Sequence, residues 1–539
     1  MGIPNYFSYI IHNHAGVLCK YINLVQNQVQ FARLYMDCNS ILYECYRKIP
    51  STEPLENIES VLLEQTSIQI ENYIYQIRPT ETVYIAFDGV APVAKMEQQR
   101  TRRYKSWFES LLMNNIEKKE AIDPKKTTSM FTPGTSFMKK LSKYMKQRFE
   151  NQETKYRLKH IIVATPDEPG EGEHKLYSHL RAKPTQMPCA IYGLDADLLM
   201  LSLFHLSYCP SLYVFRESPQ FSKQLLEKTK NENTHKDEPL FINIGILGRS
   251  ITSEMKCSAP SNHRMYDYVF LCFLLGNDFL PHFPALNIRT SGITTLLDTY
   301  RSTIGNTPER FLLSRENPPK IQWREVSRFI QELAKNEDSY ICQEYAVRKK
   351  WDKRSAEIQP KKTEKEKVDL FQNTPVLYRK EEKFINPYES GWEERYYQIL
   401  FQNANISDIC LNYLEGLEWV YKYYLLGEVD WTWKYHYHYP PLLKDLAPKI
   451  PHLATTFIKT KNTKPVSSVA QLAYVLPPAY HHLLPQDFTV NDKEYYDGYQ
   501  LNHDGLPKLQ FQWAFCRYFW ECHVHLPEIP INIIEKWNK

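Results

Sequence analysis

Four short apolar segments constrain the fold of this chain more than any other feature, because each ends on or shortly before an acidic residue. Their residues are Arg33–Asp37, Val83–Asp88, His160–Thr165 and Ala190–Leu194. Helical periodicity separates each segment from the next, and this alternation predicts an α/β fold with a mostly parallel central sheet flanked by helices. Because parallel strands open onto one crevice at their carboxyl ends, we expect the acids to meet there.

The chain has 539 residues, of which 43% are hydrophobic and 24% charged, an ordinary globular composition. The longest apolar run, Val269–Leu275, is too short to span a bilayer, so we expect no membrane contact. Nor does the N-terminal segment resemble a secretory signal. Eleven cysteines without a CxxC pair argue against a zinc ribbon or a disulfide framework. A reducing compartment is therefore expected: the cytoplasm, with the nucleus as the alternative.

Positive charge is concentrated in one part of the chain. The formal net charge is +4, yet residues 88–150 contain 14 Lys and Arg against 7 Asp and Glu. This block therefore carries a net charge of +7, and the remainder sums to −3. A basic block inside a nearly neutral protein indicates contact with a polyanion, whereas a solvated helix face is the alternative.

Glycines and acids occur together at the ends of the predicted strands, where glycine permits tight turns and close approach to a ligand. Two acid pairs have i, i+2 spacing, which in extended backbone places like charges on one face, where they repel unless a cation lies between them. Seven carboxylates are candidates for one site. They are Asp37, Asp88, Glu171, Glu173, Asp195, Asp197 and Asp278.

An all-oxygen ligand set suits Mg²⁺ or Mn²⁺ and argues against zinc. Two such ions about 4 Å apart are the usual device for in-line displacement at a phosphodiester. The alternative is a set of unrelated surface acids or helix caps, but placement at strand ends beside glycines favours a shared site.

Motifs spread along nearly the whole chain resemble those of one protein family, in the same order. They are Met1–Pro4, Asp37-x-Asn39, Phe87–Pro92, Phe131–Thr135, Pro169–Lys175, Tyr192–Asp197, Gly276–His282, Glu415–Trp419, Trp431–Tyr439 and Val475–Pro478. In these motifs the chain resembles the XRN family of 5′→3′ exoribonucleases. The resemblance implies a Mg²⁺-dependent, processive enzyme that removes nucleotides from single-stranded RNA with a 5′-monophosphate, in RNA decay. It also implies that the seven acids bind the metal ions.

A basic helix face follows the second predicted strand. Lys95, Gln99, Arg102 and Arg103 have i, i+4, i+7 and i+8 spacing, and together they can surround a terminal phosphate. The resemblance implies that these four hold the 5′-phosphate. Arg100 is expected to point elsewhere, toward nucleic-acid backbone or solvent.

An enzyme that pulls in single strands without reading sequence needs stacking surfaces. Tyr43 occupies a position where the family usually carries a base-stacking His, and its aromatic ring keeps a face for stacking. Its expected partner is a tryptophan from the C-terminal part, either Trp431 or Trp433.

We predict three regions. Residues 1–345 form an N-terminal nuclease domain with a PIN- or flap-nuclease-like core, and residues 346–384, rich in Lys and Arg, form a charged linker or mobile loop. Residues 385–539 form an aromatic-rich, mainly helical block that packs against the first domain and completes the site. The chain lacks the long C-terminal extension of large family members, so we expect a minimal, monomeric enzyme.

Two other functions share some of these features. A structure-specific DNA flap nuclease would carry similar strand-end carboxylates but a different C-terminal half. A non-catalytic RNA-binding scaffold could retain the fold, although the complete set of acids speaks against it.

Overall fold

The computed structural model describes residues 2–3, 5–50, 53–117, 127–217, 239–355, 363–427, 430–458, 463–486, 488, 495–496, 499 and 501–537. Met1 and Pro4 of the N-terminal motif lie outside these ranges. A seven-stranded sheet is the centre of the N-terminal half, in the order β1-β7-β6-β5-β2-β3-β4. Its strands are β1 (Leu18–Lys20), β2 (Arg33–Asp37), β3 (Thr82–Ala86), β4 (His160–Ala164), β5 (Cys189–Tyr192), β6 (Leu212–Arg216) and β7 (Leu240–Asn243).

The predicted α/β fold is confirmed. Strands β2 to β6 pair in parallel, while β7 runs antiparallel to β6 and to β1. The four predicted strands are all present, with ends that agree to within two residues. Strands β1, β6 and β7 were not predicted; they build one edge of the sheet.

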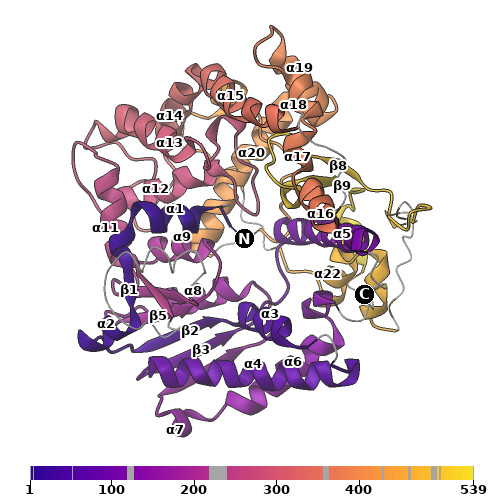
Figure 1. Ribbon diagram of the computed structural model, residues 1–539. Helices are drawn as coiled ribbons and strands as arrows, with labels where there is room; N and C mark the ends of the chain where they lie inside the picture. The colour runs from indigo at the N-terminus through magenta and orange to yellow at the C-terminus, as the bar shows by residue number, and fades with distance from the viewer. Residues whose placement is uncertain are drawn as a thin grey trace.

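Helices cover both faces of the sheet, because side chains along each buried strand alternate between two cores. Leu34 and Met36 of β2 pack with α3 (Cys38–Lys48), α4 (Leu55–Ile77) and α6 (Ser136–Phe149). Tyr35 packs on the opposite face with α8 (Gly172–Ala182) and α9 (Asp197–Phe204). Figure 1 shows α4 and α6 below the sheet and α9 above it.

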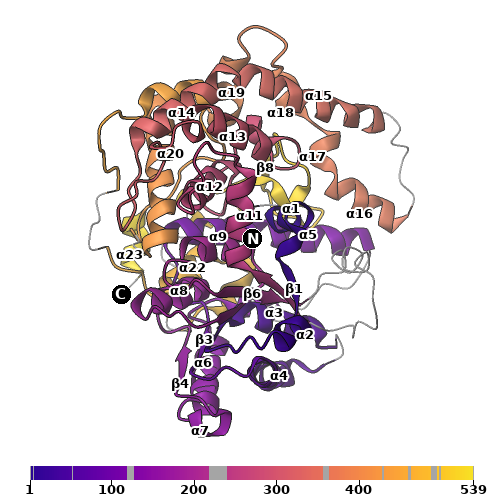
Figure 2. The same cartoon turned by 90° about the vertical axis from the view of Figure 1, so that its left-hand side faces the viewer.

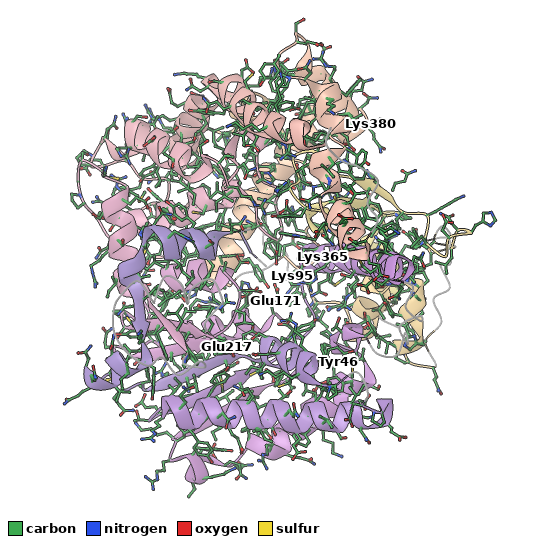
Figure 3. The ribbon with its side chains drawn as sticks, in the orientation of Figure 1. Tyr46, Lys95, Glu171, Glu217, Lys365 and Lys380 are labelled. Carbon is green, nitrogen blue, oxygen red and sulfur yellow. The ribbon has the colours of Figure 1, made fainter. Side chains whose placement is uncertain are left out.

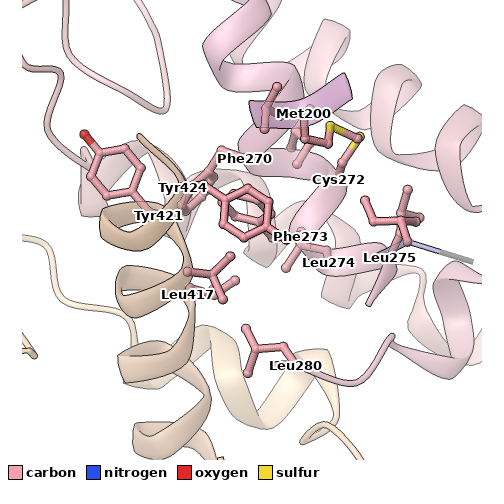
Figure 4. Close-up of a cluster of buried hydrophobic side chains, with 14 of the residues drawn as sticks. Met200, Phe270, Cys272, Phe273, Leu274, Leu275, Leu280, Leu417, Tyr421 and Tyr424 are labelled. Carbon is pink, nitrogen blue, oxygen red and sulfur yellow. The ribbon is translucent and has the colours of Figure 1, made fainter. Parts of the chain in front are cut away.

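The core on the α8 and α9 side extends from Ile3 to Phe515 and joins the C-terminal block to the sheet domain. Its further helices are α11 (Ile244–Glu254), α12 (Arg264–Cys272), α13 (Gly292–Tyr300), α14 (Trp323–Lys335), α15 (Glu337–Ser355), α19 (Trp392–Phe401) and α20 (Ile406–Tyr421). In Figure 4, Leu417 and Tyr424 pack against Phe273, and Met200 lies in the same cluster. The predicted helical block therefore packs directly on the sheet domain. Figure 2 shows α4 toward one end of the molecule and α14, α15 and α19 toward the other.

The segment predicted as a charged linker or mobile loop is mainly helical in its described residues. It comprises the end of α15, then α16 (Glu364–Gln372), α17 (Thr374–Leu377) and most of α18 (Lys380–Ile385); residues 356–362 lie outside the described ranges. Arg348, fully buried, donates to both carboxylate oxygens of Glu382 at 2.8 and 2.5 Å, and Arg379 donates to the same carboxylate at 2.6 Å. These three charges pair in the interior, whereas α16 has no buried residue.

Helix α5 (Val93–Glu117) leaves the carboxyl edge of the sheet and packs against α22 (Ser468–Val475) and α16 (Figure 1). It therefore extends from the acidic strand ends into the C-terminal block. No helix in the described part of the chain is long and apolar enough to cross a membrane.

Candidate active site

The seven predicted acids all lie at the carboxyl edge of the sheet or at the loop facing it. Asp37 ends β2, and Asp88 follows β3 by two residues. Glu171 and Glu173 are at the start of α8, and Asp195 and Asp197 are at the start of α9. Asp278 comes from a turn after α12. The elements that carry these acids are far apart in the sequence, but the sheet topology brings them to one edge.

Two hydrogen bonds hold Asp88 in place, and Gly172 lies close to both Asp37 and Asp88. The Gly172 N–H donates to Asp88 Oδ1 at 2.7 Å, and Asn39 Nδ2 donates to Asp88 Oδ2 at 2.5 Å. A Cβ at position 172 would lie 2.9 Å from Asp37 Oδ1 and 3.3 Å from Asp88 Oδ1. Glycine is therefore required here by the close approach of the two carboxylates.

Lys95 of α5 lies between two acids from different elements. Its Nζ is 2.6 Å from Glu171 Oε2 and 2.8 Å from Asp278 Oδ2, and Figure 3 shows Lys95 beside Glu171 at the centre of the molecule. Burial acts to raise the pKa of Asp278, but the nearby Lys95 ammonium favours the charged carboxylate, and the pKa lies below its ordinary value. The carboxylates in turn raise the pKa of Lys95, so this residue stays charged.

Three of the other acids have raised pKa values because they are buried beside like charges. Burial and the neighbouring Asp88 and Asp195 raise the pKa of Asp37 well above its ordinary range. Burial and Glu171 do the same for Glu173, and burial followed by Asp278 raises the pKa of Asp197 to about 7. Buried like charges with mutually raised pKa values form a single electrostatic unit that favours an added cation.

Two tyrosines that the sequence did not single out contact this unit. Tyr423 donates its hydroxyl to Glu171 Oε1 at 2.7 Å, and Tyr424 donates to Asp197 Oδ2 at 2.9 Å. Both come from a π-helical turn, Lys422–Leu426, at the end of α20, and such turns are frequent at functional sites. The His174 ring stacks on Tyr423 at a centroid distance of 3.6 Å. Aromatic richness near residue 424 was visible in the sequence, but the π turn was not.

The donor chemistry of the acid unit fits hard divalent cations. All seven candidate ligands are carboxylates, the oxygen donors that such ions prefer. Asp37 Oδ1 is buried without a hydrogen-bond partner in the described part of the chain. Among the described residues, however, no three His, Cys, Asp or Glu side chains are placed to hold one ion together. Lys95 bridges two of the carboxylates in this arrangement.

The predicted basic face lies on α5, directly beside the acids. Arg103 is partly buried, desolvation lowers its pKa to about 10, and its buried Nε has no partner among the described residues. Gln99 Oε1 is likewise buried and unpartnered, and Arg102 is half-buried. The face therefore combines Lys95, already paired with acids, with three residues whose polar groups are available to a ligand.

Comparison with known proteins identifies the family. The model described as "XRN 5′-3′ exonuclease N-terminus" matches residues 1–218, and the model "Xrn1 helical domain" matches 261–386 and 378–494. Together they cover most of the chain. The chain belongs to the XRN family.

Curated XRN relatives match 90% of the chain. The 5′-3′ exoribonuclease 2 of Arabidopsis thaliana is 26% identical, 5′-3′ exoribonuclease 1 of Saccharomyces cerevisiae 25% and 5′-3′ exoribonuclease 1 of Homo sapiens 26%. The matches cover 62%, 40% and 31% of these relatives. The chain thus spans less than two thirds of their length.

Among solved structures, the catalytic core of Rad2 in complex with DNA is similar with a TM-score of 0.29 and 15% identity, over 56% of this chain and 69% of that one.

The match to the Xrn1 helical domain crosses the predicted domain boundaries at 345 and 385. The single core shared by these regions agrees with that continuity.

The two tryptophan candidates of this XRN chain differ in their surroundings. Trp433 is only 9% exposed, stacks on Trp419 at 5.2 Å and donates to Glu415. Trp431 is half-buried, and its carbonyl accepts from the Val93 N–H at the start of α5, at 2.9 Å. Trp431 therefore has the more open ring, beside the basic helix.

Tyr43 and Arg100 lie on different sides of α5. Tyr43 is partly buried, and its ring contacts Phe131 edge-on at 5.1 Å. Arg100, expected to face nucleic acid or solvent, is 1% exposed; its guanidinium lies 5.1 Å from the Tyr474 ring and donates to the Pro527 carbonyl. That expectation was wrong because the C-terminal block covers this side of the helix.

Proposed function

We propose that this chain is a 5′→3′ exoribonuclease that hydrolyses 5′-monophosphorylated single-stranded RNA processively to nucleoside monophosphates, in mRNA and general RNA decay. One observation carries the proposal: seven acids converge at one sheet edge, directly beside the basic face of α5. Phosphodiester hydrolysis needs both parts, because the acids suit metal ions and the cations suit a phosphate. XRN family membership supports the same reaction.

The seven acids would hold two Mg²⁺ ions, with Mn²⁺ as a substitute. When bound, such ions polarise the scissile phosphate and supply an activated water. The hydrogen bonds from Tyr423 to Glu171 and from Tyr424 to Asp197 fix two carboxylates in place. In the balanced reaction one water is consumed: its oxygen bonds to phosphorus, and the 3′ oxygen of the first nucleotide leaves with a proton.

The basic face and the aromatic rings would select the substrate end. Lys95, Gln99, Arg102 and Arg103 would bind the 5′-monophosphate. Arg103 Nε, for which the described residues offer no partner, supports this role. Tyr43 and Trp431 would stack on bases, since stacking is tolerant of sequence. Trp433 is less suited, because its ring face is covered by Trp419.

We further propose a monomer that works in the cytoplasm. The eleven cysteines are all free, as a reducing compartment allows.

Digestion of five labelled substrates tests the function. They are 5′-monophosphorylated RNA, 5′-hydroxyl RNA, single-stranded DNA, a DNA flap and a circular RNA, each with Mg²⁺ and with EDTA. We expect mononucleotides from the first substrate, in Mg²⁺ only. Preferred cleavage of the flap, or fragments from a circular RNA, would support a flap nuclease; RNA binding without cleavage would support a scaffold.

A further inference from the structure

A cavity of about 540 Å³ lies on the side of α5 next to the basic face. The loops around Asp278 and Arg289, the segment 434–439 and the C-terminal residues 514–528 form its other walls. Sites for small molecules in proteins have volumes of about 300–1,000 Å³, so this cavity has room for one nucleotide.

The cavity connects the acid unit to the surface. At its inner end the Asp278 side chain is 6% exposed, and Phe279 is buried beside it. At its outer end the side chain of His436 is 51% exposed, and Trp520 is 41% exposed. A molecule released at Asp278 could therefore reach solvent along this wall without crossing the core.

One cation in the cavity is available for a ligand. Arg289 is paired with Glu521 at 2.5 Å, Lys434 lies 3.2 Å from Glu528, and Lys105 donates to two backbone carbonyls. Within the described residues Arg102 makes no hydrogen bond or ion pair. Helical spacing places Arg102 between the face of Lys95 and the cavity, so its guanidinium can serve both.

Two amide groups in the wall have a buried polar atom without a partner. In the part of the chain that the structure describes, Gln98 Oε1 is an unpartnered acceptor and Asn277 Nδ2 an unpartnered donor. The Asn277 side chain is fixed, because its oxygen accepts from the N–H groups of Phe279 and Leu280, each at 2.9 Å. Leaving such groups unpaired costs free energy, and because both residues line the cavity, a ligand with polar edges would lie beside them.

Aromatic rings complete the wall: Phe279 is at the inner end, Tyr437 lies along it, and Trp520 is at the outer end. A ligand that suits this wall has an anionic group for Arg102, a flat ring for the aromatic side chains and polar edges for the two amides. A nucleotide has all three.

We infer that this cavity receives the nucleoside 5′-monophosphate product before it leaves the enzyme; the inference rests on the proposed function. Hydrolysis leaves the original 5′-phosphate on the released nucleotide, beside Lys95 and Arg102. The new RNA end must take the same place before the next cycle. The product therefore has to depart by a path that the RNA does not occupy, and the cavity offers that path past Arg102.

Equilibrium binding of adenosine 5′-monophosphate tests this, using calorimetry on the full chain. Thr101→Trp would fill the cavity, since Thr101 lies in its wall, and Trp520→Ala would remove a ring at the outer end. Because Trp520 is half-exposed, we expect its replacement by alanine to leave folding intact. Tyr378→Ala, at an exposed ring outside the cavity wall, is the matched control.

We expect the dissociation constant of adenosine 5′-monophosphate to rise at least about tenfold in Thr101→Trp and several-fold in Trp520→Ala, with no change in Tyr378→Ala. Adenosine and inorganic phosphate, each alone, should bind more weakly than the nucleotide. Unchanged binding in both folded cavity variants would overturn the inference, as would equal binding of phosphate alone.

Kinetics separate this inference from the proposed function. In Thr101→Trp the steady-state rate on 5′-monophosphorylated RNA should fall more than the single-turnover rate, because release is obstructed. An equal fall in both, together with weaker RNA binding, would place the cavity on the RNA path and overturn the inference. Absence of RNA hydrolysis by the wild-type chain would refute the proposed function, while nucleotide binding would still report on the cavity.

Discussion

The acid unit at the sheet edge and the cluster of Arg348, Arg379 and Glu382 both bury charge, with opposite results. In the cluster one carboxylate is matched by two guanidinium groups, and its pKa is lowered by Arg348 despite burial. At the sheet edge Lys95 pairs directly with only two of seven acids, and the pKa values of several others are raised.

This difference indicates a structural role for the cluster and a functional role for the acids at the sheet edge. A buried charge with matched partners contributes little net stability, although breaking it is costly, so its role is to fix the packing of the helices around it. A buried set of like charges is a strained arrangement that a bound cation would relieve. The same residue types thus indicate different roles according to whether their charges balance.

The largest expected effect comes from Asp197→Asn, which removes charge but keeps shape. Mg²⁺-dependent hydrolysis should fall by several orders of magnitude, because a carboxylate proposed to bind a metal ion loses its charge, while RNA binding survives. Rate assays and RNA binding measurements check this, with the exposed Asp298→Asn as the control. A folded Asp197→Asn protein with normal activity would remove this residue from the site.

The matched cluster should respond in the opposite way. Glu382→Gln removes the carboxylate that pairs closely with both Arg348 and Arg379 and leaves the more distant Glu344, 3.8 Å from Arg348, to balance the buried charge. The free energy of unfolding should therefore fall by about 3–5 kcal/mol, while the folded enzyme keeps its rate. Urea denaturation measures this, and the exposed Glu332→Gln should cost less than about 1 kcal/mol. If both substitutions cost the same, the cluster does not stabilise the packing.

The choice of RNA end tests the cations beside the acids. Arg102→Ala should reduce the preference for 5′-monophosphate over 5′-hydroxyl RNA by about ten- to a hundredfold, the range of one charge-assisted hydrogen bond. Lys95→Ala should act in the same direction. Competition assays with both RNAs measure the preference, and the exposed Lys140→Ala serves as the control. A uniform loss on both substrates would mean that Arg102 contacts the RNA backbone generally.

The smallest effect is on the pH dependence of stability in EDTA. The pKa of Asp197 is raised from 3.8 to about 7, so between these values the folded chain holds the proton more tightly than the unfolded chain. Stability should therefore fall as pH rises through this window. Melting temperatures at pH 5 and pH 8 should differ more in the wild type than in Asp197→Asn.

Added Mg²⁺ should raise the melting temperature at pH 8, and more so in the wild type, since binding to the folded state stabilises it. The opposite result in EDTA would contradict this prediction. If stability rose with pH, and rose more in the wild type than in Asp197→Asn, the acids would not repel one another.

The sequence predicted the parallel strands because buried apolar runs and terminal acids are local patterns. It did not predict β1, β6 and β7, the first of which is only three residues long and antiparallel to β7. The helices in the charged segment were missed for a different reason. Arg348 and Glu382 are 34 residues apart, and their pairing depends on tertiary structure.

For the candidate site, the sequence predicted acids that the structure brings together, since strand ends of a parallel sheet share one edge. Tyr423 and Tyr424 could not be predicted, because an α-helical reading of α20 gives no reason for two adjacent hydroxyls to reach Glu171 and Asp197. Arg100 was misplaced because helical spacing shows which face a residue occupies, but not what covers that face. The metal ions, the 5′-phosphate contacts and the stacking rings stay predictions.

The close contact between Gly2 and Asp197 has a practical consequence for recombinant work. A Cβ at Gly2 would lie 1.9 Å from Asp197 Oδ1, so the first residues of the chain are packed onto the acid unit. An affinity tag joined ahead of Gly2 would start beside Asp197 and the other acids at the sheet edge and crowd them. Tags and fluorescent fusions should therefore be attached at the other end of the chain, or cleaved so that residue 2 remains glycine.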